Sequence, residues 1–219
     1  MESCKILSRL VEMDEEITRQ IETVSFSGKS MLYPIRRVRM TYYSRGPNTS
    51  DLSNFNILVG EEGTTIPRRI FVVLVKQSAM HGTLGEDPFY YRNCQLKDVS
   101  LRVAGQNVPF PEFFCNFATG NVLGPYFATL NACGAFLNEI DLGIDVSEFV
   151  KRSTILGFDL TASQLQPGEA FEMDKDKNIQ LILRTHAPIA HAINVIIYAE
   201  YDAEIEIMSN KRVVKHLYA

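Results

Sequence analysis

The run Ile70-Phe71-Val72-Val73-Leu74-Val75 decides the fold class of this chain. It is continuous, apolar and rich in β-branched residues, which is typical of a strand that is covered on both faces. The chain has 219 residues, of which 46% are hydrophobic and 22% charged, as in ordinary globular proteins. An all-β domain of about 200 residues commonly forms one unit, so we expect a single main domain.

Segments with strand periodicity lie on both sides of this run. Residues 35–43 alternate as a half-buried strand does, with one apolar face and one polar face. Further strands are expected at 55–59, 95–103, 154–160, 178–184, 192–201 and 204–208. Residues 104–107 supply a turn after the strand expected at 95–103. The two faces of 35–43 are Val38, Met40 and Tyr42 against Arg37, Arg39 and Thr41, and the expected inward residues elsewhere are Val99, Leu101, Val103, Ile179, Leu181 and Leu183.

Helical patterns occur at three places. Residues 4–24 carry apolar residues at steps of three and four, which places them on one stripe of an amphipathic helix. Shorter helices are expected near 122–137 and 147–152, with Ser147 as the cap of the latter. Many short strands with two helical insertions predict a mainly β protein, an antiparallel β-sandwich of the jelly-roll kind with an N-terminal amphipathic helix.

The sequence offers no recognisable catalytic or cofactor site. The four cysteines form no CxxC pair and do not stand near a histidine, and His186 and His191 flank a turn between strands. The segment Gly28-Lys29-Ser30 lacks the earlier glycine of a phosphate-binding loop. We therefore expect no enzyme activity, no metal and no other cofactor. A net charge of −4 also argues against direct nucleic-acid binding.

The first residues are acidic and lack a continuous apolar core, and no segment approaches the length of a membrane span. We therefore expect a protein that is not secreted and does not contact a membrane, located inside a cell.

Four carboxylates share the parity of one strand near the C-terminus. Glu200, Asp202, Glu204 and Glu206 would form a row on one face if the strand is unbroken. One interpretation is a solvated face, or a bend near Asp202 that separates the charges. The other is a subunit contact, in which the row meets basic residues of the same chain or of a neighbour. The candidate basic partners are Arg36, Arg37 and Arg39 together with Lys211, Arg212 and Lys215.

The helical stripe at 4–24 also has two interpretations. It packs on its own sandwich, or it docks on a neighbouring subunit and supports self-association. The candidate contact residues of this stripe are Ile6, Leu10, Met13, Ile17 and Ile21.

A series of short motifs follows one another along the chain: Tyr33-Pro34-Ile35-Arg36-Arg37-Val38, Pro67-Arg68-Arg69-Ile70, Asp87-Pro88-Phe89, Gly105-Gln106-Asn107-Val108-Pro109, Gly157-Phe158-Asp159-Leu160-Thr161 and Asn194-Val195-Ile196-Ile197-Tyr198-Ala199-Glu200-Tyr201. The series covers about residues 31–210, and its order is more specific than any single motif. In this order the motifs resemble the second half of Polinton/Maverick-type major capsid proteins.

This resemblance implies a capsid-type structural role. The family builds double jelly rolls that trimerise and tile an icosahedral shell, whereas only the second roll has a counterpart here. We expect an N-terminal helix and linker at 1–30, a jelly-roll domain at 31–210 and a basic tail at 211–219, in a protein that self-associates, as a trimer in the family's manner, or co-assembles with related capsid subunits. Two alternatives stay open: a domesticated, capsid-derived protein that binds intact subunits and interferes with assembly, and a ligand-binding jelly-roll module.

Overall fold

The structure is a computed structural model that describes residues 12–52, 55–57, 66–103, 105–135, 142–161, 179–209 and 212–216. The chain divides into two compact units. One contains Met1–Ile35 and Glu204–His216, and the other contains Arg36–Ala203 and Leu217–Ala219. Each unit is described by itself below. No helix in the described part of the chain is long and apolar enough to span a membrane.

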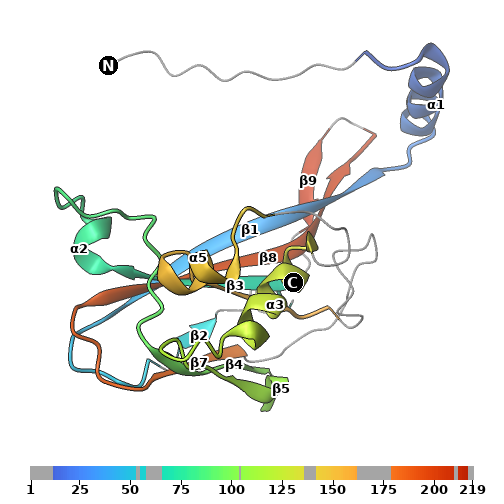
Figure 1. The fold of residues 1–219 in the computed structure, drawn as a ribbon. Coiled ribbons are helices and arrows are strands. Elements are labelled where there is room, and N and C mark those ends of the chain that lie inside the picture. Colours follow the sequence, from blue (N-terminus) through green and yellow to red (C-terminus); the bar gives the residue numbers. More distant parts are fainter. Residues whose placement is uncertain are drawn as a thin grey trace. The chain divides into compact units, whose positions relative to one another are not determined.

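β-Strands are the commonest element of the described chain, and short helices lie before and between them (Figure 1). The helices are α1 (Glu15–Phe26), α2 (Gln77–Met80), α3 (Leu123–Ala132) and α5 (Val146–Lys151). The strands are β1 (Met31–Arg45), β2 (Phe55–Ile57), β3 (Arg69–Lys76), β4 (Leu96–Val103), β5 (Gln106–Phe114), β6 (Ile155–Asp159), β7 (Ile179–Thr185), β8 (Ile193–Ile207) and β9 (Val213–His216).

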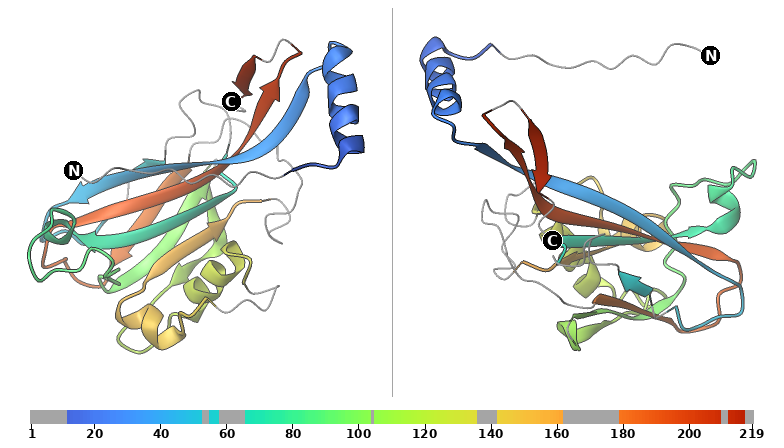
Figure 2. Two further views of the ribbon diagram at one scale, coloured as in Figure 1. Left: turned by 90° about the horizontal axis from the view of Figure 1, so that it is seen from above. Right: turned by 180° about the vertical axis from the view of Figure 1, so that it is seen from behind.

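The strands form two antiparallel sheets with jelly-roll topology. One sheet has the order β1-β8-β3-β6, with β9 also paired to β8, and the other has the order β2-β7-β4-β5. Strands that are distant in sequence lie side by side, as in the pairs β3–β8 and β4–β7. Figure 2 shows the two sheets as separate layers. The predicted fold class, a mainly β antiparallel sandwich of the jelly-roll kind, is confirmed.

The core lies between the two sheets. β3 contributes Ile70, Val72 and Leu74, which are almost fully buried, and the odd-numbered residues of β8 face the same interior. The opposite sheet contributes side chains with no exposed surface, as the alternation in the sequence predicts. These residues are Val99 and Leu101 of β4 and Ile179, Leu181 and Leu183 of β7.

Three strand predictions need correction. The segments 192–201 and 204–208 form one continuous strand, β8, so there is no bend at Asp202. The basic tail expected at 211–219 contains strand β9, which pairs with the end of β8. The predicted turn at 104–107 is shorter, because Gln106 already pairs with Val103 in a hairpin. Residues 58–59 of the expected strand 55–59 lie outside the described residues.

The β1 prediction is half right. Its residues alternate as expected, but the apolar face is the exposed one: Val38, Met40 and Tyr42 point to solvent, whereas Arg37, Arg39 and Thr41 are half-buried. The core-facing side of β1 therefore carries the arginines, and Tyr43 of that side packs against the core. The alternation in the sequence therefore predicted the two faces of the strand, but it did not predict that the apolar face is the exposed one.

The helix and turn predictions also change in detail. Helix α5 is capped by Asp145, not Ser147, because its carboxylate accepts the N–H of Glu148 at 2.7 Å. The described helical segment α3 is shorter than 122–137, and residues 136–137 lie outside the description. The turn expected between His186 and His191 is the β7–β8 connection, which joins the two sheets and is not a hairpin of paired strands.

The N-terminal unit contains helix α1. The Asp14 carboxylate accepts the N–H of Glu16 at 2.8 Å, which caps the helix start, and Gly28 has a φ of +78° just after its end. Met13 and Ile17 of the predicted stripe are about half exposed. Ile6 and Leu10, and the beginning of the predicted helix at residue 4, lie outside the described residues.

Candidate assembly surface

The outer face of the β1-β8-β3-β6 sheet is the side that points away from the second sheet. On β8 the even-numbered residues lie on this face, because the odd-numbered ones are in the core. The Ser44 hydroxyl donates a hydrogen bond to Oδ1 of Asn194 at 2.6 Å, which places the even-numbered side of β1 on the same face. Within the larger unit, the outer face therefore carries both the exposed apolar residues of β1 and the carboxylates Glu200 and Asp202.

Helix α3 covers the β6 end of this outer face (Figure 2, left). The contact is close because β6 has glycine at position 157: a Cβ there would lie 2.8 Å from Cα of Thr129. The Thr129 hydroxyl accepts the N–H of Gly157 at 2.9 Å and donates to the carbonyl of Ile155 at 2.7 Å. The helix thus satisfies backbone groups of a strand that ends the sheet, as well as covering its face.

The β1 end of the outer face is open. Val38, Met40 and Tyr42, here called the β1 stripe, are 45%, 68% and 62% exposed. Tyr198 of the neighbouring strand β8 adds a further exposed aromatic ring on this face. A row of apolar side chains on a long strand that ends a sheet is a feature of strands that pair or pack with another chain.

Glu200 and Asp202 of the carboxylate row lie beside this stripe, in the middle of the sheet. Glu200 is only 4% exposed and pairs with Arg69 at 2.8 Å and with Arg36 at 3.4 Å. Asp202 pairs with Arg68 at 3.0 Å, in a site that is also largely closed to solvent. For these two acids the expected solvated face is wrong, and their basic partners come from the same chain.

The sequence identified one of these partners and missed two. Arg36 belongs to the predicted basic set, whereas Arg68 and Arg69 were not considered as partners of the row. The available signal was their position: they directly precede the buried run of β3, so the strand carries them onto the sheet. Because β3 is antiparallel to β8, the backbone register then sets Arg69 opposite Glu200.

The remaining carboxylates of the row, Glu204 and Glu206, belong to the other unit. Glu204 is 8% exposed, and its Oε1 has no hydrogen-bond partner among the described residues. Of the C-terminal basic residues predicted to meet the row, Lys211 lies outside the described residues, Arg212 is exposed and Lys215 belongs to strand β9. Contact of Glu204 or Glu206 with a neighbouring subunit therefore stays a prediction.

The described residues contain no grouping of three or more histidine, cysteine or acidic side chains that could hold a metal ion. The thiols are also poor nucleophiles at neutral pH. Burial raises the pKa of Cys94 to about 11, and burial together with the charge of Asp98 raises the pKa of Cys115 to about 12.

Comparison with known proteins shows the fold. No family model matches the chain. It is 23% identical over 197 residues to the uncharacterized protein F54H12.2 of Caenorhabditis elegans, covering 87% of this chain and 45% of that protein. The chain therefore spans less than half the length of this curated relative.

Solved viral capsid structures of the double jelly-roll type resemble the fold. A chain in the structure of the Sputnik virophage matches 85% of this chain with a TM-score of 0.51 and 13% identity. PBCV-1 VP54, fitted into a reconstruction of that virophage, matches 94% with a TM-score of 0.53 and 12% identity. This chain covers 38% and 55% of those chains, about half of each.

Proposed function

We propose that this chain is a capsid-type structural protein that assembles with a second jelly-roll subunit through the β1 stripe. The observation that carries the proposal is the exposure of Val38, Met40 and Tyr42 on a strand that ends a jelly-roll sheet. Contact on this face would remove apolar surface from water, and each fully buried side chain of this size contributes about 1.5 to 3 kcal/mol.

The likeness to capsid structures supports this choice of partner. The matched capsid chains extend well beyond the part that this chain covers, and so does the C. elegans relative. In the capsid chains, the part that matches this fold is therefore followed or preceded by further polypeptide of the same chain. The partner proposed here is another jelly roll, from a second copy of this chain or from a related capsid subunit.

The proposal includes the finer resemblance to the second roll of Polinton/Maverick-type capsid proteins. In that case assembly follows the family's trimeric pattern, inside a cell or in a virion. The protein then acts by association, without catalysis, a cofactor, nucleic acid or a membrane. The proposal also includes contacts of the other unit with a neighbouring subunit. These contacts would use Met13 and Ile17 of α1, which are exposed in the described chain, and the carboxylates Glu204 and Glu206.

A pair of substitutions that introduce charge on β1 tests the proposal. Met40→Glu with Tyr42→Glu puts two carboxylates on the stripe, where their side chains remain solvated in the monomer and repel an apolar partner. Sedimentation velocity over a range of concentrations should show oligomers for the natural chain and monomers for the double variant. Leu84→Glu is the matched control, because Leu84 is fully exposed outside the sheets and should leave association unchanged.

Melting temperatures of all three proteins check that the fold survives. A natural chain that stays monomeric at every concentration and does not bind a related capsid subunit would overturn the proposal. So would a double variant that associates as the natural chain does.

A further inference from the structure

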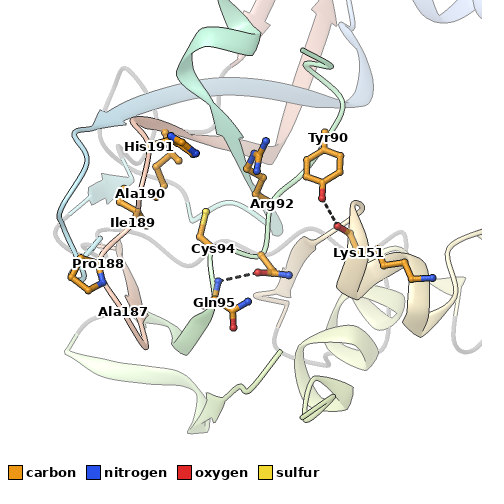
Figure 3. Close-up of a pocket in the computed structure, with 12 residues that line it drawn as sticks. Tyr90, Arg92, Cys94, Gln95, Lys151, Ala187, Pro188, Ile189, Ala190 and His191 are labelled. Carbon is orange, nitrogen blue, oxygen red and sulfur yellow. Dashed lines mark hydrogen bonds between the residues drawn. The ribbon is translucent and has the colours of Figure 1, made fainter. Parts of the chain in front are cut away.

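A pocket of about 370 Å³ lies within the larger unit and shares no lining residue with the β1 stripe (Figure 3). One wall is the end of the β3–β4 connection, with Tyr90, Arg92 and Cys94. The facing wall is the β7–β8 connection, where Pro188, Ile189 and Ala190 give an apolar surface and His191 stands beside them. The pocket therefore combines an apolar body with a few polar groups, as sites for small ligands do.

Two charged residues line this pocket, the exposed Lys151 and Arg92. Arg92 is half-buried, and its guanidinium lies 4.8 Å from the centre of the Tyr90 ring. None of the residues that line the pocket is acidic, and no described carboxylate forms an ion pair with Arg92. The acid whose pKa responds to Arg92, Glu86, is itself bonded to Lys76 and Ser78. A half-buried cation without a carboxylate favours an anion supplied by a ligand.

The other basic residues have different positions. Lys151 offers its backbone carbonyl, which accepts the Tyr90 hydroxyl at 2.9 Å, while its ammonium extends away from the other labelled residues (Figure 3). The imidazole of His191 is exposed at the pocket and supplies a ring N–H there in the appropriate tautomer. The guanidinium of Arg92 and the imidazole of His191 together suit a ligand that carries a single negative charge.

The backbone beneath Arg92 is held in an unusual conformation. Cys94 and Gln95 are consecutive non-glycine residues with φ of +46° and +52°. Asn93 maintains this geometry, because its Oδ1 accepts the N–H of Gln95 at 2.9 Å and its Nδ2 donates to the Val150 carbonyl at 2.8 Å. Left-handed backbone at two successive bulky residues is typical of binding sites that the surrounding structure holds ready.

We propose that this pocket binds a carboxylate attached to an apolar body. The carboxylate pairs with Arg92, and the apolar part packs on Pro188 and Ile189. The carboxylate source is either a free small acid or an acidic side chain of a peptide. This binding site is independent of the β1 stripe, so the outcome of one test leaves the other unaffected.

Titration of the natural chain with hexanoate, followed by amide shifts in ¹H–¹⁵N spectra, tests the proposal. Saturable shifts are expected for Arg92, Cys94, Gln95 and His191. Hexanamide has the same apolar body without charge and should bind at least about tenfold more weakly, a difference of about 1.4 kcal/mol. Arg92→Gln should weaken hexanoate binding by a similar factor, and Arg102→Gln, at an exposed arginine of β4, should leave it unchanged.

A second titration distinguishes the sources. Tighter binding of N-acetyl-leucyl-glutamyl amide than of hexanoate supports a peptide ligand, and the reverse supports a small acid. The proposal is overturned if hexanamide binds the natural chain as tightly as hexanoate, or if neither acid gives saturable shifts up to its solubility limit. The comparison of hexanoate with hexanamide needs no variant, so it holds even if Arg92→Gln does not fold.

Discussion

The two ends of the β1-β8-β3-β6 sheet are completed in different ways. At the β6 end, α3 covers the outer face, and Thr129 bonds to the backbone of Gly157 and Ile155. At the β1 end, the stripe of Val38, Met40 and Tyr42 stays exposed. Among the described residues, helix α3 therefore covers one end of the sheet, whereas the stripe at the other end is exposed. This difference indicates which side of the sandwich a partner subunit would occupy.

Between the two ends lies the ion-pair cluster of β8. Arg69 connects this cluster to helix α3. Its Nε pairs with Glu200 at 2.8 Å, and its Nη1 donates a hydrogen bond to the carbonyl of Ala132, at the end of α3, at 3.1 Å. Glu200 also meets Arg36 of β1. The cluster thus connects the covered end of the sheet to the open one, and its loss should have the largest effect on stability.

Arg69→Met removes the closest partner of a carboxylate that is 4% exposed. Breaking a buried ion pair costs about 3 to 5 kcal/mol, and Glu200 still has Arg36 at 3.4 Å, so the free energy of unfolding should fall by up to about that amount. Urea denaturation measures it. Adding Glu200→Met should recover much of the loss, because the unpaired charge is then gone. Arg102→Met, at an exposed arginine, is the control and should stay within about 0.5 kcal/mol.

Gly157→Ala tests the covered end directly. The new methyl group would meet Cα of Thr129 at 2.8 Å, so α3 must shift away from β6. Overpacking of this kind costs about 1 to 3 kcal/mol in the free energy of unfolding. Gly46→Ala is the matched control: nothing lies within 4 Å of its Cβ position and its φ is not positive, so it should be neutral or slightly stabilising. Equal stability of the two variants would contradict close packing of α3 on β6.

Much of this architecture was predictable because local periodicity determines strands and inward faces. The runs at β3, β4 and β7 carry apolar side chains at the positions that are buried in the structure. For β1 the sequence predicted two different faces but did not determine which one is buried, for a physical reason. Burial depends on which side the rest of the chain covers, and alternation alone reports only that the two faces differ.

The candidate site was predictable only in part. The carboxylate row follows from strand parity in β8, but the partners Arg68 and Arg69 depend on the pairing of β3 with β8, which lie about 130 residues apart. The pocket beside Arg92 likewise needs two connections from distant parts of the sequence. The capping of α5 by Asp145 was missed because Ser147 and Asp145 both fit a cap, and only the hydrogen bond distinguishes them.

The smallest effect is expected at the open end. Met40→Ala and Tyr42→Ala delete side chains that are 68% and 62% exposed, so the free energy of unfolding of the monomer should change by no more than about 0.5 kcal/mol. Phe71→Ala is the comparison on the same outer face. Phe71 packs on Tyr198 at 6.1 Å between ring centres and lies beside Gly157, so its loss should cost about 2 kcal/mol. Urea denaturation at concentrations where the chain is monomeric separates the two cases. A loss at Met40 or Tyr42 as large as that at Phe71 would mean that the chain itself covers the β1 stripe, and the two ends of the sheet would then be alike.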